Sequence, residues 1–534
     1  MTQVPDEPGA ATGSPPPEPL VRSTSVVGSM TFLSRISGLA RDVVFAQLAG
    51  AGALMDAFFF AFKLPNLLRR FFAEGAFSQA FVPVMAEYRA TRSAEETREL
   101  IARVAGTLAA ALFAITLIGV AAAPILVVVL GTGIVTGDGP VELATAMLRF
   151  TFPYILFISL TAMAGSVLNT FGRFAVPAFT PVLLNLSLIA AAVWLAPRLD
   201  EPVLALAIGV FVAGVVQLAF QIPFLLKAGL LPRPRLGFSH PGVRRVLVLM
   251  LPVLFASSIA QINILFDTWI ALFLADGSVS WLYYSDRLVE FPLGVFGIAI
   301  ATVILPTLSS HHARESRDSF TATIDWALRG VLLIGVPAAV ALFMLAEPLL
   351  ATILFGGEFA ANDVRMSAAS LMAFAPGLIG FILVKVLVPG FFARQDTRTP
   401  VGIAVKALLI GMALNVVFVL TLLRTGWAPP HAGLAAATTL SSLTNASLLL
   451  RGLRRAGVYR PAAGWGLMFL RVALATAVMA LALYWLLAQA GDWLAMGRGI
   501  RILWLAAAVT GGAGLYFAAG YAAGLRPAQF RLRE

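Results

Sequence analysis

The sequence lacks cysteine and contains little charge of either sign. Only 12% of its 534 residues are charged, while 59% are hydrophobic, and soluble proteins average roughly 25% charged residues. This composition leaves too little polar surface for a water-soluble globule, so the bilayer must be the principal solvent. The absence of cysteine excludes disulfides and thiolate metal sites.

Histidine is scarce, and no nucleotide-binding loop is present. The four histidines lie in or beside predicted loops: His240, His311, His312 and His431. The predicted membrane helices therefore lack the histidines that histidine-based or metal-activated catalysis would need. We expect a transporter without a cofactor. Without a GxxxxGKS or GxxxxGKT motif, ATP is not expected to drive it directly, which leaves a proton, a monovalent cation or the membrane potential. Asp267 and Asn415 are a weak candidate for a cation site, with a structural hydrogen bond as the simpler interpretation.

Apolar stretches of about 20 residues recur along the chain and predict an all-α polytopic membrane protein. Residues 1–22 are rich in proline and lack the basic start and apolar core of a signal peptide. They predict a disordered tail. About fourteen transmembrane helices are expected, over 24–50, 54–87, 100–130, 143–171, 175–196, 202–228, 244–275, 280–309, 320–345, 363–392, 399–423, 432–451, 465–489 and 500–522.

Lysine and arginine are distributed unevenly among the predicted loops. Loops on the side of the N-terminus hold most of them, with clusters over 89–103, 227–245 and 451–460. The opposite loops and helix ends contain few: Arg198, Arg365, Arg424, Arg498 and Arg501. The positive-inside rule then places both termini in the cytoplasm. This asymmetry accounts for the net charge of +11, so no nucleic-acid partner is expected.

Three prolines recur 223 residues further along the chain, in the pairs Pro83/Pro306, Pro153/Pro376 and Pro177/Pro400. Helices 1–6 and 7–12 are therefore expected to form two pseudo-symmetric six-helix lobes, as in alternating-access transporters with a central cleft. The predicted division is a tail over 1–22, an N-terminal lobe over 23–228, a C-terminal lobe over 229–455, and helices 13 and 14 with a short cytoplasmic tail over 456–534.

Ionisable side chains lie within several predicted helices. The cations are Arg35, Arg41, Lys63, Arg69, Arg70 and Arg287, and the acids are Asp42, Asp56, Glu74, Asp286 and Glu290. Each charge facing lipid at the bilayer centre costs about 2.5–3.5 kcal/mol, so these side chains must line a cavity. Arginine makes bidentate contacts with phosphate, which predicts a phosphate-bearing ligand. Ion pairing that merely locks the helices together is the alternative.

Charges of opposite sign occupy corresponding places in the two lobes. Lys63 and Glu290 each precede a proline by two residues. We therefore expect pairs across the lobes, Lys63 with Glu290 and Arg41 with Asp286, to hold one end of the cleft closed. A phosphate-bearing ligand would compete with these carboxylates and so favour rocking of the lobes.

Four segments resemble the MurJ (MviN) family of lipid II flippases. They are SRISGLARDVVFAQLAGAG at 34–52, DAFFFAFKLPNLLRRFFAEGAFSQAFVPVMAEY at 56–88, SVSWLYYSDRLVEFPLGVFGIAIATVILP at 278–306 and VKVLVPGFFARQDTRTPV at 384–401. The similarity runs from about residue 23 to the C-terminus and leaves out the acidic tail. By motif match, the family's functional cavity residues correspond to Arg35, Arg41, Asp56, Arg69 and Arg287, and its gate to Glu74.

The resemblance implies the fourteen-helix fold of the MOP superfamily, with a groove for a polyprenyl tail between helices 13 and 14. The implied activity is movement of lipid II, the undecaprenyl-diphosphate-linked peptidoglycan precursor, from the cytoplasmic to the outer leaflet of the bacterial inner membrane. Lipid II and membrane lipids are the implied ligands, and other cell-wall synthesis proteins are candidate partners.

Two other functions compete with this one. Another flippase or exporter of the MOP superfamily would share the fold, although an exporter of cationic drugs should place acids rather than arginines in its first lobe. A membrane glycosyltransferase would also bind a polyprenyl diphosphate. It needs a catalytic carboxylate that water can reach, for which Asp286 with Glu290 is the fair candidate.

Overall fold

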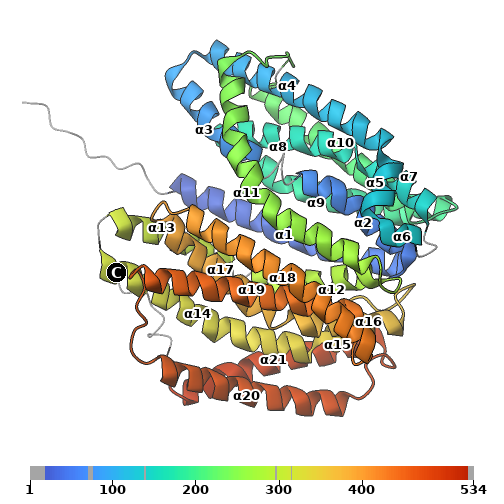
Figure 1. The fold of residues 1–534 in the computed structure, drawn as a ribbon, viewed down its shortest axis with the longest axis vertical. Coiled ribbons are helices and arrows are strands. Elements are labelled where there is room, and N and C mark those ends of the chain that lie inside the picture. Colours follow the sequence, from blue (N-terminus) through green and yellow to red (C-terminus); the bar gives the residue numbers. More distant parts are fainter. Residues whose placement is uncertain are drawn as a thin grey trace, which may run out of the picture.

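The computed structural model describes residues 18–69, 76–136, 140–231, 233–294, 298–313 and 316–526. These residues form helices and short connections, with one isolated bridge between Gly356 and Phe359 and no strand. The helices lie roughly side by side in two groups, with α1 and α11 running between them (Figure 1).

The first lobe holds ten α-helices, and π and 3-10 turns extend α9. They are α1 (Glu18–Ala49), α2 (Ala53–Arg69), α3 (Ala76–Thr91), α4 (Ala94–Ala121), α5 (Ala123–Leu130), α6 (Thr132–Thr136), α7 (Val141–Thr151), α8 (Tyr154–Thr170), α9 (Ala175–Ala190), η2 (Ala191–Leu195), η3 (Ala196–Arg198) and α10 (Leu204–Lys227).

The second lobe and the C-terminal pair make up the remainder. The lobe holds α11 (Pro241–Ala271), α12 (Ser278–Pro292), α13 (Ile298–Ala313), α14 (Arg317–Met344), α15 (Ala346–Ile353), α16 (Ala361–Phe374), α17 (Gly377–Phe392), α18 (Arg398–Thr425) and α19 (Pro430–Arg455). The C-terminal pair is α20 (Trp465–Ala490) and α21 (Arg498–Ala522).

The helix bounds repeat at the offset seen in the prolines. Helix α14 begins and ends 223 residues after α4, and α17 and α18 begin 223 residues after α8 and α9. Pro153 and Pro376 are the N-caps of α8 and α17, where a missing N–H costs no helical hydrogen bond. The packing repeats too, because α8 and α9 pack on α10 as α17 and α18 pack on α19.

Among the described residues, nine helices are long and apolar enough to cross a membrane, or ten if the bent pair α16 and α17 is one span. The expected number of fourteen is therefore not confirmed. Helix α1 carries Arg35, Arg41 and Asp42, which lower its hydropathy. The expected spans 54–87 and 280–309 contain residues outside the described part of the chain.

Helix α11 breaks the symmetry of the two lobes. Its first half packs on α3 and α4 of the first lobe, where Val246 and Met250 join a buried cluster with Phe81. Its second half packs on α18 and α19. An ion pair of 2.8 Å joins Arg245 to Glu87 at the start of the helix. One continuous helix therefore contacts both lobes, as its course in Figure 1 shows.

The C-terminal pair is anchored to the second lobe through a buried carboxylate. Helix α20 packs on α14 and α21 on α15, at the lower edge of Figure 1. Asp325 of α14 accepts hydrogen bonds from Tyr459 Oη at 2.8 Å, Trp465 Nε1 at 2.7 Å and Arg329 Nε at 2.7 Å. These bonds fix the segment that leads from α19 into α20.

Candidate functional site

Arg41 lies at the junction of three helices. Its Nε and Nη2 donate to Asp42 Oδ1 at 3.0 and 2.6 Å, and its Nη1 donates to Asn185 Oδ1 of α9 at 3.1 Å. Nη2 also donates to Tyr283 Oη of α12 at 2.9 Å, which crosses from the first lobe to the second. The residue is 5% exposed. Burial without partners would be costly, and these contacts offset that cost.

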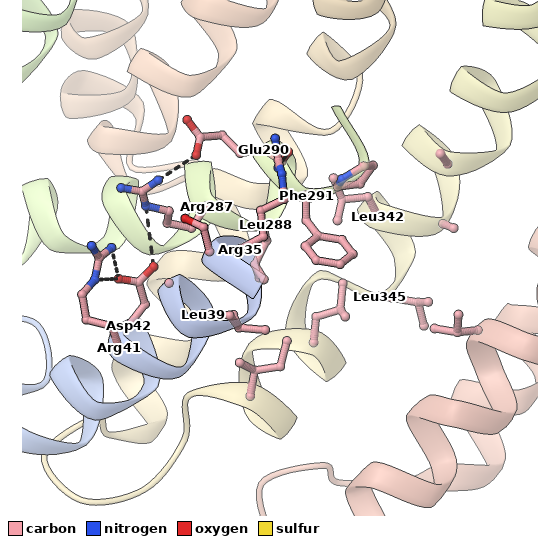
Figure 2. A pocket seen from close by; sticks show the side chains of 18 of the residues that line it. Arg35, Leu39, Arg41, Asp42, Arg287, Leu288, Glu290, Phe291, Leu342 and Leu345 are labelled. Carbon is pink, nitrogen blue, oxygen red and sulfur yellow. Dashed lines mark hydrogen bonds and ion pairs between the residues drawn. The ribbon is translucent and has the colours of Figure 1, made fainter. Parts of the chain in front are cut away.

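Asp42 connects this cluster to Arg287 of α12. Tyr283 Oη donates to Asp42 Oδ1 at 3.0 Å, and Arg287 Nε lies 3.6 Å from Asp42 Oδ2. Arg287 Nη1 is 2.7 Å from Glu290 Oε2. The four charged groups therefore form an alternating chain from Arg41 to Glu290, which Figure 2 shows as dashed lines.

Arg35 lies seven residues before Asp42, which is about two helical turns. It therefore faces the same chain of charges. Its Nη1 donates to the backbone oxygen of Glu290 at 3.4 Å. A Cβ at Gly294 would lie 1.9 Å from that nitrogen, so a glycine provides the space for the guanidinium.

The charged chain borders a cavity of about 680 Å³. Charged side chains line one part of the cavity, and apolar ones line the rest (Figure 2). The apolar lining includes Leu288, Phe291, Leu342, Leu345, Leu349, Ile353 and Val509. Because Val509 belongs to α21, the apolar part reaches from the two lobes to the C-terminal pair.

A second cavity of about 250 Å³ shares two lining residues with the first, Arg287 and Glu290. Lys63 and Asp286 also line it. Lys63 Nζ donates to Thr268 Oγ1 of α11 at 2.8 Å, a contact between the lobes. Of the two pairs expected from the sequence, Glu290 pairs instead with Arg287, and Arg41 with Asp42.

Asp56 lies at one end of the bundle, where it caps a helix of the other lobe. Its Oδ2 accepts from Gly277 N at 2.8 Å, and its Oδ1 accepts from Ser280 N and Oγ at 2.8 and 2.5 Å. A carboxylate at a helix N-terminus satisfies free N–H groups and the helix dipole. Asp56 lines neither of the two cavities. Asp56 therefore joins the first lobe to the start of α12.

Backbone contacts complete this end. Glu358 N donates to Gln47 O at 3.1 Å, and Tyr284 Oη donates to Gly50 O at 3.3 Å. A Cβ at Gly50, whose φ is +59°, would lie 2.3 Å from Glu358 O, so only glycine permits this approach. We call the contacts of Gln47, Gly50 and Asp56 with the second lobe the closed end.

The remaining predicted residues have different surroundings. Asp267 accepts from Asn415 Nδ2 at 2.6 Å and from Asn263 Nδ2 at 3.0 Å, so the two residues of the weak cation candidate do meet. Arg69 donates to Asn66 Oδ1 at 2.6 Å at the end of α2 and lines neither of the two cavities. Arg70 and Glu74 lie outside the described residues.

Tyr283 and Asn185 were missed by the sequence analysis. Both join Arg41 to other helices. Tyr283 stands in the segment SWLYYSDR beside charged residues, which was an available signal. Asn185 is a single amide within the apolar helix α9, and nothing in the sequence distinguishes it from a packing residue.

Comparisons with known proteins agree with this geometry. The model of the family described as "Lipid II flippase MurJ" matches residues 45–502. A "Probable lipid II flippase MurJ" of Vibrio cholerae is 47% identical over 506 residues, which cover 93% of this chain and 95% of the relative. A "Lipid II flippase MurJ" of Burkholderia cenocepacia is 42% identical and covers 96% and 99%.

Solved structures show the same fold. The structure titled "Lipid II flippase MurJ, inward closed conformation" matches with a TM-score of 0.76 and 25% identity, over 92% of this chain and 97% of that chain. An inward-facing multidrug transporter of the MATE family, from the MOP superfamily, matches with a TM-score of 0.64 at 15% identity, over 81% and 98%. The chain belongs to the MurJ family of lipid II flippases.

Proposed function

We propose that this protein moves lipid II from the cytoplasmic to the outer leaflet of the bacterial inner membrane, and that the lipid leaves it chemically unchanged. The observation that carries the proposal is the 680 Å³ cavity with arginines on one part of its wall and an apolar remainder that reaches α21. A polyprenyl diphosphate has the same two parts, an anionic group and a long apolar tail.

Arg35 and Arg287 would meet the diphosphate first. The side chain of Arg287 is 34% exposed, whereas those of Arg41 and Asp42 are 6% and 5% exposed. A diphosphate that binds Arg287 competes with Asp42, since both anions need the same guanidinium. Displacement of Asp42 would then weaken the contacts of Arg41 and Tyr283 across the lobes.

Alternating access follows from this competition. In the described conformation the lobes meet at the closed end, which we assign to the outer face of the membrane, with both termini in the cytoplasm. A ligand changes the balance between two conformations only through different affinities for them. The diphosphate supplies this difference because it replaces contacts that join α1 to α12.

A coupling ion has one candidate site. Asp267 of α11 lies beside Asn415 of α18 and Asn263, and carboxylate and amide oxygens are suitable ligands for a hard monovalent cation. We propose that a monovalent cation or a proton at Asp267 supports resetting of the lobes. Lipid II and membrane lipids are the proposed partners, together with other cell-wall synthesis proteins.

The test is depletion of the protein in its host, with lipid II quantified in each leaflet. Unmodified lipid II should accumulate in the cytoplasmic leaflet, and a plasmid-borne wild-type copy should restore its export. Arg287→Ala should fail to restore export although it inserts in the membrane, while Arg424→Ala, at an exposed helix end, should succeed. An unchanged distribution of lipid II after depletion would overturn the proposal, and a new lipid product would indicate an enzyme.

A further inference from the structure

Helix α15 connects the apolar wall of the first cavity to the closed end. Leu349 and Ile353 of this helix line the cavity, as does Val509 of α21. Two residues after α15 the chain forms a narrow turn, in which Gly356 and Phe359 exchange two backbone hydrogen bonds of 3.2 Å. So short a connection passes any displacement of α15 on to the turn.

The turn makes backbone contacts of the closed end with α1. Glu358 N donates to Gln47 O at 3.1 Å. A Cβ at Gly357, whose φ is +57°, would lie 2.3 Å from Gln47 O, so glycine permits this close approach. Phe359 is fully buried and packs edge-on against Tyr284 of α12, with the ring centroids 5.3 Å apart. A shift of the turn would therefore loosen the closed end.

Arg501 of α21 holds the end of α15 that lies nearest the turn. Its Nη1 donates to the backbone oxygen of Ala351, and its guanidinium lies over the ring of Phe355 at 5.0 Å from the centroid. The residue is 7% exposed. Among the described residues it has no ion pair with an acid, and its Nε has no hydrogen-bond acceptor.

This position is costly for a charged side chain. A buried guanidinium loses its hydration, and one carbonyl oxygen with one aromatic face replaces only part of it. Arg498, one turn earlier on α21, is exposed to solvent and avoids that cost. A methionine would fill the place of Arg501 without a buried charge. The contact with Ala351, which an apolar side chain cannot make, therefore explains the arginine better than packing does.

The corresponding helix of the first lobe has no such attachment. Helix α5 also leads to a glycine turn that approaches the other lobe, since a Cβ at Gly133 would lie 2.1 Å from Leu272 O. It packs on α4, α6 and α7 of its own lobe and does not line the first cavity. Helix α15, in contrast, packs on α21, beside which Figure 1 shows it.

We propose that Arg501 is a positioning residue that couples the apolar chain of the lipid substrate to the closed end. A chain in the first cavity packs against Leu349 of α15 and Val509 of α21. Because Arg501 fixes α15 to α21 beside the turn, α15 adjusts to the chain by a movement that the turn shares. Without Arg501, α15 separates from α21 and the turn stays in place. The inference rests on the proposed function and assigns the chain its own effect on the closed end.

The experiment compares two diphosphates that differ in the chain alone. Undecaprenyl diphosphate carries the full chain, and isopentenyl diphosphate carries a single isoprene unit. The full-length protein in lipid nanodiscs carries spin labels at Leu54→Cys, at the start of α2, and at Trp427→Cys, after α18. Both positions are exposed, and the chain has no other cysteine. The distances between the labels give the ratio of open to closed molecules. Undecaprenyl diphosphate should raise this ratio about fivefold more than isopentenyl diphosphate, as a typical coupling does.

Three variants of α21 test the role of the guanidinium. Arg501→Met keeps the length of the side chain and removes its donors, so the two diphosphates should then have equal effects. Arg501→Lys keeps a charged donor and should restore part of the difference. Arg498→Ala is the matched control, because it removes a charge from an exposed position of the same helix; it should behave as the wild type. A merely structural role for Arg501 would lower the melting temperature and leave the chain-dependent difference intact.

A further variant tests the coupling without a ligand. Val509→Phe adds bulk to the cavity wall between α21 and α15, and it should raise the ratio of open molecules with Arg501 present but not with Arg501→Met. An unchanged ratio in both backgrounds would overturn the inference. Equal effects of the two diphosphates on the wild type, or a full chain-dependent difference in Arg501→Met, would overturn it too. If neither diphosphate changes the wild-type ratio, the proposed function fails, and Val509→Phe still decides the coupling.

Discussion

Arg41 is fixed by partners from three helices before any ligand arrives. Asp42 and Tyr283 hold one side of its guanidinium and Asn185 holds another. Such a guanidinium is already desolvated and oriented, so a diphosphate that displaces Asp42 meets a positioned donor. Arg287 is more exposed, so under the proposed function the diphosphate meets it before Arg41.

Replacement of Arg41 should therefore abolish lipid export rather than reduce it slightly. Arg41→Ala removes a buried bidentate donor, and Arg41→Lys keeps the charge but loses the planar fork. We expect export to fall at least tenfold in the alanine variant and to recover partly in the lysine variant. Export by Arg41→Ala at the wild-type level, with equal protein in the membrane, would remove Arg41 from the site.

Asp42 and Arg287 should behave as a coupled pair. Removing one partner leaves the other buried charge without its counter-charge, so Asp42→Asn or Arg287→Gln alone should lower thermal stability more than the double variant does. The measurement is a double-mutant cycle on melting temperatures in detergent. Strictly additive losses would show that the 3.6 Å contact carries no coupling.

The charged residues of the site could be found from the sequence, but their partners could not. A charge in an apolar segment is costly in any direction, so Arg41 and Arg287 were identified. The expected pair of Lys63 with Glu290 rested on equal distances to proline. Glu290 lies three residues after Arg287 on one helix and pairs there, because neighbours one turn apart meet more readily than residues of separate lobes.

At the scale of helices, the N-terminus of α12 is capped by Asp56, a residue of the first lobe. The carboxylate accepts from four N–H or O–H groups at the start of α12. The first N–H groups of a helix need acceptors from outside the helix. Separation of the lobes at the closed end would therefore leave the first turn of α12 without acceptors until water replaces Asp56. The closed end is thus stabilised by a cap that the other lobe supplies.

Loss of this cap should open the closed end. A helix cap contributes about 0.5–2 kcal/mol, so Asp56→Ala should raise the population of the open state severalfold. The chain lacks cysteine, so Val279→Cys, at a position 1% exposed, can report opening through its labelling rate. Labelling should rise severalfold in the presence of Asp56→Ala.

Asp363 provides the control for this experiment. It is also a buried carboxylate, but it accepts from Trp281 and Ala360 within the second lobe. Asp363→Ala should lower thermal stability without favouring the open state. Similar labelling of Val279→Cys in both backgrounds would mean that Asp56 does not act as a gate.

The helix pattern was predictable in outline because apolar segments and repeated prolines follow from the membrane and from duplication. The breaks within spans could not be predicted. The apolar pattern runs on without interruption through α7 and α8 and through α16 and α17, and the bend of 43° in the second pair depends on packing. The attachment of α11 to the first lobe could not be predicted either, because an apolar helix face fits either lobe.

The whole molecule combines two lobes of similar fold, but the cavities are lined by different kinds of side chain. Arginines of α1 and α12 border one cavity and amides of α11, α18 and α19 border another, while Val509 of α21 extends the apolar part of the first. The lobes therefore share a fold although the side chains that line their cavities differ. Sequence alone placed the cations in the first lobe but gave no signal for the cavity among α11, α18 and α19, whose polar residues are common in membrane helices.

Orientation in the membrane is open to direct measurement. Trp427→Cys lies in the connection after α18 at a position 88% exposed, and Arg235→Cys lies between the lobes on the arginine-rich side. In intact cells an impermeant thiol reagent should label the first and leave the second unlabelled until lysis. Ser278, a natural choice from the sequence, is fully buried and unsuitable. Labelling of Arg235→Cys in intact cells would reverse the orientation.

The two ends of the molecule should respond differently to salt. None of the described contacts of the closed end is an exposed ion pair. Asp56 is 5% exposed and its partners are neutral, whereas Arg245 and Glu87, which join α11 to α3 at the far end, are about half exposed. The Debye length falls from about 10 Å at 0.1 M to about 3 Å at 1 M salt. Concentrated salt should therefore loosen α11 from α3 while Val279→Cys in an otherwise wild-type chain stays protected. Rising ionic strength should thus weaken the contact between Arg245 and Glu87 before it affects the contacts of the closed end.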